Sequence, residues 1–116
     1  NFDALAEAME VLLPDVPVIS EDLPAAVEVE AGAAHTFDLT VESVARGTLS
    51  YQWQKAAIAT PTTFVDISGA TSVDYAIATW ADETHAGVYR CKVVNTFNNV
   101  TATVYSAACA ATTAEA

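Results

Sequence analysis

The sequence has 116 residues, enough for one domain that buries about two-thirds of the surface of its unfolded chain. Fifteen acidic residues stand against four lysines and arginines, so the formal net charge is −11. Binding to nucleic acid or to an anionic membrane requires clustered basic residues, and this balance argues against both. No apolar stretch is long enough for membrane insertion. Two cysteines are too few for a disulfide framework or a zinc site.

Residues 2–13 predict an amphipathic helix that ends at Pro14. A helix this short is not stable alone in water, so it must pack on its own domain, on a sister copy or on a partner protein. We therefore expect residues 1–15 to form a helical anchor and linker. The segment also lacks the positive start and continuous apolar run of a secretory signal peptide. Four apolar residues recur at spacings of three and four, share one helical face and are the expected partner contacts: Phe2, Leu5, Met9 and Leu12.

After a proline-containing segment, expected to be an extended linker or an edge strand, the hydrophobic period changes to two. Alternation of apolar and polar residues at this period is typical of half-buried strands. Turn signals separate the segments, and no helical pattern lies between them. The sequence therefore predicts an all-β fold, an antiparallel sandwich. The alternating segments are 35–43, 49–55, 74–78, 88–94 and, after an Asn98-Asn99 turn, 100–107.

Four phrases match one known family in combination: AGAAHTFDL, LSYQWQK, ISGATSVDYAI and HAGVYRCKVVN. Together they resemble an immunoglobulin-like domain of the I-set type. The resemblance implies a Greek-key β-sandwich over residues 16–108, followed by a flexible tail at 109–116. It also implies that Trp53 is the buried tryptophan of strand C. Tyr89 then occupies the tyrosine corner, where the hydroxyl bonds the backbone a few residues upstream.

The sequence departs from this family at the disulfide between strands B and F. In the resemblance, the position facing Cys91 is Leu39, so that bond cannot form, and Cys91 is expected to pack as a small hydrophobic residue against Leu39 and Trp53. If the strands beside the Asn98-Asn99 turn pair, Cys91 lies opposite about residue 106. Cys109 is then one cross-strand pair too far along, and a Cys91–Cys109 disulfide is the less favoured alternative. A domain without the bond fits folding in a bacterial cytoplasm.

No enzyme motif is present: the sequence lacks GxSxG, HExxH, a P-loop and GxGxxG. His35 and His85 are 50 residues apart, with no plausible nucleophile beside either. His85 stands where these domains usually carry an aspartate and is expected to be a surface residue. We therefore expect a protein that is not an enzyme and uses no cofactor and no metal.

Recognition is the remaining kind of function. The resemblance implies that the B–C loop (43–48) and the F–G loop (96–100) share one end of the sandwich. Exposed aromatic and arginine side chains are favoured anchors in interfaces. Arg90 and Lys92 are further expected to face outward on strand F, next to strand C with Lys55, so that most of the positive charge lies on one sheet, where it would suit an acidic partner. The candidate binding residues of the two loops are Arg46, Phe97, Asn98 and Asn99, the last of which begins a glycosylation sequon.

These features favour a non-enzymatic structural and display module. Capsid decoration proteins of tailed bacteriophages that resemble this plan pair a small anchoring segment with a projecting sandwich, which is thought to adhere weakly to host surfaces or carbohydrate. Our leading hypothesis is a virion surface protein of a tailed phage, on the capsid or the tail. Its partners would be capsid or tail subunits or copies of itself, with host-surface carbohydrate as a ligand. The alternative is an adhesion module of a bacterial cell-surface protein.

Overall fold

The computed structural model describes residues 14–114, so the predicted anchor face of Phe2, Leu5, Met9 and Leu12 lies outside the described residues. Within this range the fold is all-β with one short helix, which confirms the predicted class. The elements are β1 (Ile19–Glu21), β2 (Ala26–Glu30), β3 (His35–Asp38), β4 (Thr40–Val41), β5 (Thr48–Ala56), β6 (Val65–Asp66), β7 (Asp74–Ile77), α2 (Asp82–His85), β8 (Gly87–Phe97), β9 (Val100–Tyr105) and β10 (Cys109–Ala114).

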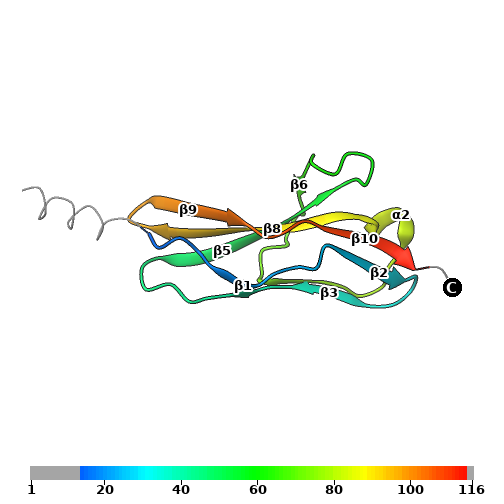
Figure 1. Ribbon diagram of the computed structural model, residues 1–116, viewed down its shortest axis with the longest axis horizontal. Helices are drawn as coiled ribbons and strands as arrows, with labels where there is room; N and C mark the ends of the chain where they lie inside the picture. Colours follow the sequence, from blue (N-terminus) through cyan, green and yellow to red (C-terminus); the bar gives the residue numbers. More distant parts are fainter. Residues whose placement is uncertain (1–13, 115–116) are drawn as a thin grey trace, which may run out of the picture.

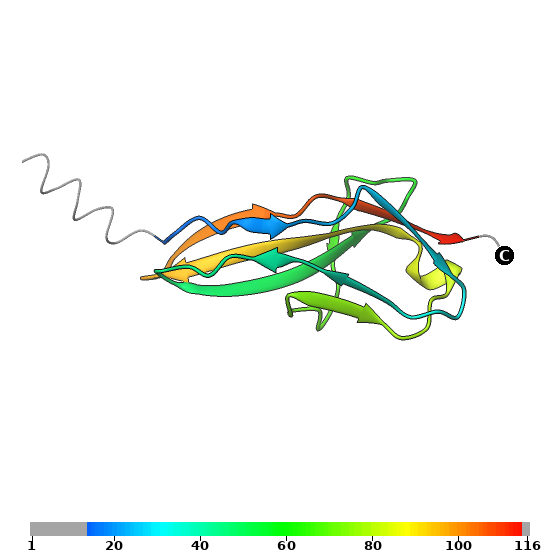
Figure 2. The ribbon, with the colours of Figure 1, turned by 60° about the horizontal axis from the view of Figure 1, so that its bottom comes forward.

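The strands form two packed layers (Figures 1 and 2). One layer is a six-stranded sheet in the order β2-β10-β8-β5-β6, with β9 also paired to β8. The second layer contains the antiparallel pairs β1–β4 and β3–β7. Since β1 pairs in the second layer and β2 runs parallel to β10 in the first, the chain crosses between the layers at residues 22–25.

The period-two pattern of the sequence corresponds to alternating burial in the strands. In β3 and the residues after it, Phe37 and Leu39 are buried, while Asp38 and Thr40 are exposed. In β8, Tyr89, Cys91 and Val93 are buried with partly exposed residues between them. This follows from strand geometry, because successive side chains point to opposite faces of a sheet and only one face meets the other layer.

Aromatic rings fill the space between the layers. The Phe37 and Tyr89 rings stack with centroids 4.5 Å apart, and Trp53 is fully buried with its Nε1 donating to the carbonyl of Ser72 at 2.8 Å. The Tyr89 hydroxyl donates to the backbone carbonyl of His85, as the tyrosine-corner position predicts. All four residues that the sequence predicts for the core are buried: Leu39, Trp53, Tyr89 and Cys91.

The C-terminal segment corrects one prediction. Residues 109–114 are not a flexible tail, because β10 pairs antiparallel with β8 and parallel with β2. Its Cys109 and Ala111 side chains are fully buried. The alanines and threonines there gave no strong period-two signal, yet small side chains fit where β10 lies between two neighbouring strands. The domain therefore extends past residue 108.

Residues 106–108 separate β9 from β10 and are hydrogen-bonded to the segment 22–25, where the chain crosses between the layers. The Ser106 amide donates to the Cys91 carbonyl at 2.9 Å, and the Ser106 hydroxyl accepts from the Cys91 amide at 2.8 Å. Asp22 Oδ1 accepts from the backbone amides of Leu23 at 2.7 Å and Ala107 at 2.9 Å. The Asp22 carboxylate thus joins the crossing at residues 22–25 to the break at residues 106–108. These two irregular segments precede β2 and β10, which pair in the larger sheet.

Candidate functional site

The two predicted binding loops lie at one end of the molecule. The β5–β8 register pairs Thr48 with Thr96, which places the loop before β5 next to the β8–β9 turn. Asn98 and Asn99 form a two-residue hairpin turn with φ values of 51° and 61°. Among residues other than glycine, asparagine adopts this left-handed backbone conformation most readily. Residue 14 lies at this same end, and residue 114 lies at the opposite end (Figure 1). We call the end formed by residues 14–18, 43–47 and 97–100 the base.

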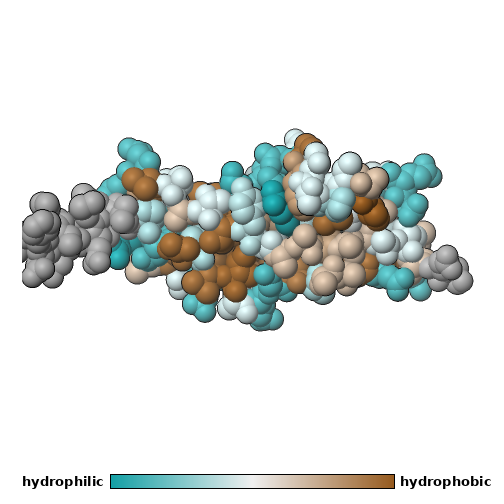
Figure 3. Space-filling view, turned by 45° about the horizontal axis from the view of Figure 1, so that its top comes forward, coloured by the Kyte–Doolittle hydropathy of each residue, from teal (hydrophilic) through white to brown (hydrophobic). Residues whose placement is uncertain are grey.

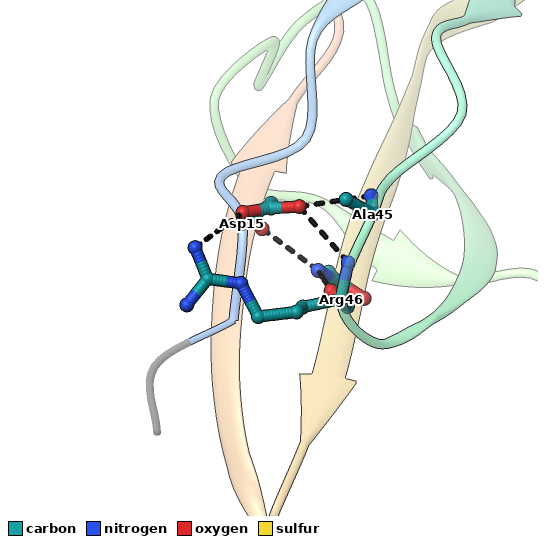
Figure 4. A network of polar contacts seen from close by, with 4 residues as sticks. Asp15, Ala45 and Arg46 are labelled. Atoms are coloured by element: carbon teal, nitrogen blue, oxygen red, sulfur yellow. Dashed lines mark hydrogen bonds and ion pairs between the residues drawn. The ribbon is translucent and has the colours of Figure 1, made fainter. Parts of the chain in front are cut away.

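Asp15 holds the entering chain to the base through its carboxylate (Figure 4). Its Oδ2 accepts from the backbone amides of Ala45 at 2.9 Å and Arg46 at 3.0 Å. Its Oδ1 lies 3.6 Å from the Arg46 Nη2, an ion pair in which both side chains are about one-third exposed, at 32% and 38%. The paired backbone amides orient the carboxylate, so the contact does not depend on the exposed ion pair alone.

The buried side chain of Asn95 also contacts Asp15 and Arg46. Its side chain is fully buried, and its Nδ2 donates to the carbonyls of Asp15 at 2.8 Å and Arg46 at 2.7 Å. Gly47, at φ +114°, leaves the room that this amide occupies, since a Cβ there would lie 2.0 Å from Asn95 Oδ1. We call Asp15, Arg46, Gly47 and Asn95 the Asp15 clamp.

The Asp15 clamp gives Arg46, one of the four predicted loop residues, a role within the domain. Arg46 was expected to meet a ligand, but its backbone and guanidinium both engage Asp15. Phe97 is half-buried, whereas Asn98 and Asn99 are exposed. Neither Asn95 nor Asp15 was predicted from the sequence to belong to this site. Asn95 could have been found, because it is a polar residue at an inward position of the alternation that includes Cys91 and Val93.

Three exposed valines belong to the segments that form the base. Val16 and Val18 are 65% and 50% exposed in the segment that leads into β1, and Val100 is 41% exposed at the start of β9. Figure 3 shows hydrophobic side chains gathered in the half of the molecule nearest the base. Isolated exposed valines are ordinary, but several in one region give an apolar surface of the kind that partners cover.

Lys55, Arg90 and Lys92 lie on one sheet, as predicted, because β5 pairs with β8, but they do not share one face of that sheet. Lys55 lies two positions after the buried Trp53 and therefore on the same side of β5. Its Nζ donates to the carbonyl of Thr84 and lies 5.8 Å from the centroid of the Tyr89 ring. Arg90 and Lys92 alternate with buried residues of β8 and lie on the outer face of the larger sheet.

Both cysteines are free and fully buried, as the unpaired interpretation predicts. The register places Cys109 opposite Tyr89 rather than opposite Cys91, which explains why the two sulfurs do not bond. Burial raises the pKa of the Cys91 thiol to about 11 and also raises the pKa of Cys109. A buried thiol that keeps its proton is a poor nucleophile.

His85 ends the short helix and is part of a local polar cluster. Its Nδ1 accepts from the Ala81 amide at 2.9 Å, and its ring lies 5.5 Å from the Trp80 ring. The Thr113 hydroxyl accepts from Trp80 Nε1 at 2.9 Å and donates to Asp82 at 2.6 Å, which fixes α2 to β10. These contacts give His85 a structural role.

A cavity of about 100 Å³ opens between β2 and β3, lined by residues that include Leu23, Phe37 and Cys109. Pockets for small-molecule ligands are typically about 300–1,000 Å³. Within residues 14–114, no group of three or more histidine, cysteine or acidic side chains is placed to hold a metal ion. No helix in this part of the chain has the length and hydropathy needed to cross a membrane.

Comparison of the chain with models of protein families and with curated protein sequences gives no match.

Proposed function

We propose that this chain is an immunoglobulin-like β-sandwich that acts as a non-enzymatic display module, held on a larger assembly through its base. The immunoglobulin-like assignment draws support from Trp53 in the core and from the Tyr89 hydroxyl bonded to the backbone of His85. It also draws support from the N-terminal strands, since β1 pairs with β4 in one layer and β2 with β10 in the other.

The observation that carries the display function is the Asp15 clamp. A docking segment transmits its position to the domain only if the connection between them is fixed. Asp15 makes four polar contacts, three from its carboxylate to Ala45 and Arg46 and one from its carbonyl to Asn95, so the described chain enters the sandwich at a defined point. Phe2, Leu5, Met9 and Leu12 would then dock beside the exposed Val16, Val18 and Val100.

The proposed setting is the virion surface of a tailed bacteriophage, with capsid or tail subunits as partners. Two buried, unpaired cysteines suit assembly in a reducing bacterial cytoplasm, where disulfides rarely form. The net charge of −11 keeps an exposed module soluble and limits contacts between neighbouring copies.

One observation favours a second candidate, a module in a chain of domains on a bacterial surface. The first and last described residues lie at opposite ends of the molecule (Figure 1), which is the arrangement that tandem domains require. Flanking repeats of this domain in the complete gene would favour the surface protein. Neighbouring capsid and tail genes would favour the virion.

A rebinding experiment tests the docking function. The full chain should bind stripped capsids or tails of the phage that encodes it, and Leu5→Asp with Met9→Asp should abolish binding. Val73→Asp is the matched control, because Val73 is 36% exposed outside the base and takes the same change from an apolar residue to an acid. Unchanged binding by the double variant would reject the N-terminal segment as the anchor.

A further inference from the structure

Two basic residues remain available on the outer face of the larger sheet. Arg46 is paired with Asp15 and Lys55 is bonded to the Thr84 carbonyl, whereas neither Arg90 nor Lys92 forms an ion pair with any described residue. In the register, Arg90 lies opposite Gln54, and Lys92 lies between Gln52 and Tyr105. We call Gln52, Arg90, Lys92, Thr103 and Tyr105 the Arg90 face.

The Arg90 guanidinium is held in place by the domain itself. Its Nε donates to Gln54 Oε1 at 2.7 Å, and Gln54 Nε2 in turn donates to Asp66 at 2.8 Å. The guanidinium carbon lies 4.0 Å from the centroid of the Phe64 ring and 4.2 Å from that of Tyr105. Cation–π contacts of this kind fix the plane of the group.

The outer edge of the Arg90 guanidinium makes no hydrogen bond with a described residue. Among the described residues, its terminal nitrogens have no hydrogen-bond partner, and Asp66 bonds the Gln54 amide rather than Arg90. A planar fork of N–H donors matches the two oxygens of a carboxylate. Because the side chain is already ordered, binding would cost less conformational entropy than it would for a mobile arginine.

The surroundings of Arg90 favour a ligand that binds on a shallow surface. The Tyr105 side chain is 48% exposed, and Ser50 and Thr103, which both lie opposite Val94, carry hydroxyl groups on the same face four residues along β8 from Arg90. Hydroxyl, amide and single aromatic groups suit a sugar ring, whose C–H surface packs on an aromatic ring while its hydroxyls form hydrogen bonds. A protein interface would instead require a larger apolar centre.

We propose that the Arg90 face binds a carboxylate-bearing sugar, a hexuronate unit of an acidic polysaccharide. Its carboxylate accepts from the Arg90 fork, with Lys92 as a second positive charge, and its ring packs beside Tyr105. Arg90 lies seven residues along β8 from Phe97, about 23 Å from the base, so the face stays open when the base is docked. The inference rests on the proposed display function and names the class of ligand that the displayed domain would bind.

The test is calorimetric titration of the full chain with polygalacturonate, with dextran as the neutral sugar and polyglutamate as the acidic polymer that is not a sugar. Polygalacturonate should bind, and the other two should bind at least tenfold more weakly. Arg90→Gln should weaken polygalacturonate binding at least tenfold, and Arg90→Lys several-fold because the fork is lost. Lys55→Gln, with the same charge change at a contact outside this face, should leave affinity within twofold.

Absence of polygalacturonate binding, or equal binding of polyglutamate, would overturn the proposal. Lys92→Gln provides a second test if Arg90→Gln does not fold, since Lys92 forms no side-chain hydrogen bond or ion pair with a described residue; unchanged affinity in this variant would also count against the proposal. The variant Leu5→Asp with Met9→Asp should retain sugar binding in full. Failure of the Arg90 face and failure of the N-terminal anchor are therefore distinguishable.

Discussion

Asp15 and Asn95 are 80 residues apart in the sequence and are joined by a hydrogen bond of 2.8 Å from the buried Asn95 amide to the Asp15 carbonyl. The bond connects the entering chain to the middle strand of the larger sheet. It places residues 14–18 beside the loop before β5 and gives the base its shape. The contact fixes the point at which the described chain enters the two layers.

Removing the Asp15 carboxylate should loosen the base. Asp15→Ala leaves the amides of Ala45 and Arg46 without their acceptor and removes the ion pair with Arg46, so we expect a loss of about 1–2 kcal/mol in the free energy of unfolding. Urea denaturation measures it. Glu28→Ala, which removes an exposed acid in β2, is the control and should change stability by less than about 0.5 kcal/mol. Equal effects of the two substitutions would contradict the role of Asp15.

Gly47 should be less replaceable than Gly69. Both have positive φ, at 114° and 78°, so alanine is strained at each. Only at Gly47 would a Cβ collide with the Asn95 side chain, 2.0 Å away, since Gly69 has nothing within 4 Å. We expect Gly69→Ala to cost about 1 kcal/mol and Gly47→Ala clearly more. Thermal unfolding of the two variants gives the comparison, and similar midpoints would mean that the collision is relieved at little cost.

The exposed acids of the second layer include a repulsive pair. Asp38 and Asp74 lie directly opposite each other on β3 and β7, and like charges in this arrangement destabilise a sheet. Asp74→Asn should therefore stabilise the domain by about 0.2–1 kcal/mol at low salt. Chemical denaturation should show the gain shrink as salt screens the repulsion. A loss of stability would indicate that the Asp74 carboxylate has a favourable partner.

The thiols should be hidden in the folded protein. Cys91 and Cys109 are fully buried and their pKa values are raised, so a thiol reagent should react slowly with the native chain. After denaturation without a reductant, titration should count two free thiols. A count of zero would mean that they form a disulfide.

Burial of Cys91 should also make stability fall at alkaline pH. The folded state keeps the thiol proton up to a pKa of about 11, whereas the ordinary value is 9.0, so the unfolded state loses its proton first. The stability from this group is therefore complete below about pH 9 and is lost as pH rises from 9 toward 11. Urea titrations at pH 8 and 10.5 should show a steeper loss for the natural chain than for Cys91→Ala. An equal loss of stability in the natural chain and in Cys91→Ala would mean that other groups cause the alkaline effect.

The strands were predictable wherever burial alternated with exposure. The segment around Phe37 and Leu39 and the one around Tyr89 and Cys91 contain large apolar residues at every second position, which only a strand can place on one face. The position opposite Cys91 followed from the Asn98-Asn99 turn, and Ser106 does bond to Cys91. β10 escaped prediction because alanine and threonine carry too little hydrophobic contrast to mark a face.

The candidate site was less predictable than the fold. The sequence marked Arg46 and Phe97 through residue type and loop position, but it contained nothing to pair Arg46 with Asp15. Likewise, the contacts of Arg90 with Phe64 and Tyr105 join residues from three separate segments, and residue type alone does not place their side chains together.

The sequence alone was enough to predict the all-β class, the inward residues of each main strand and the turn at Asn98-Asn99. These depend on local periodicity and on residue type, which the chain carries at each position. The packing of the whole domain was needed to show that β10 continues the sheet, that Asp15 holds the entering chain, and that Arg90 is fixed on the outer face while Lys55 faces the other layer. Those outcomes depend on which distant segments become neighbours, and that is set by the pairing of strands and the packing of two layers.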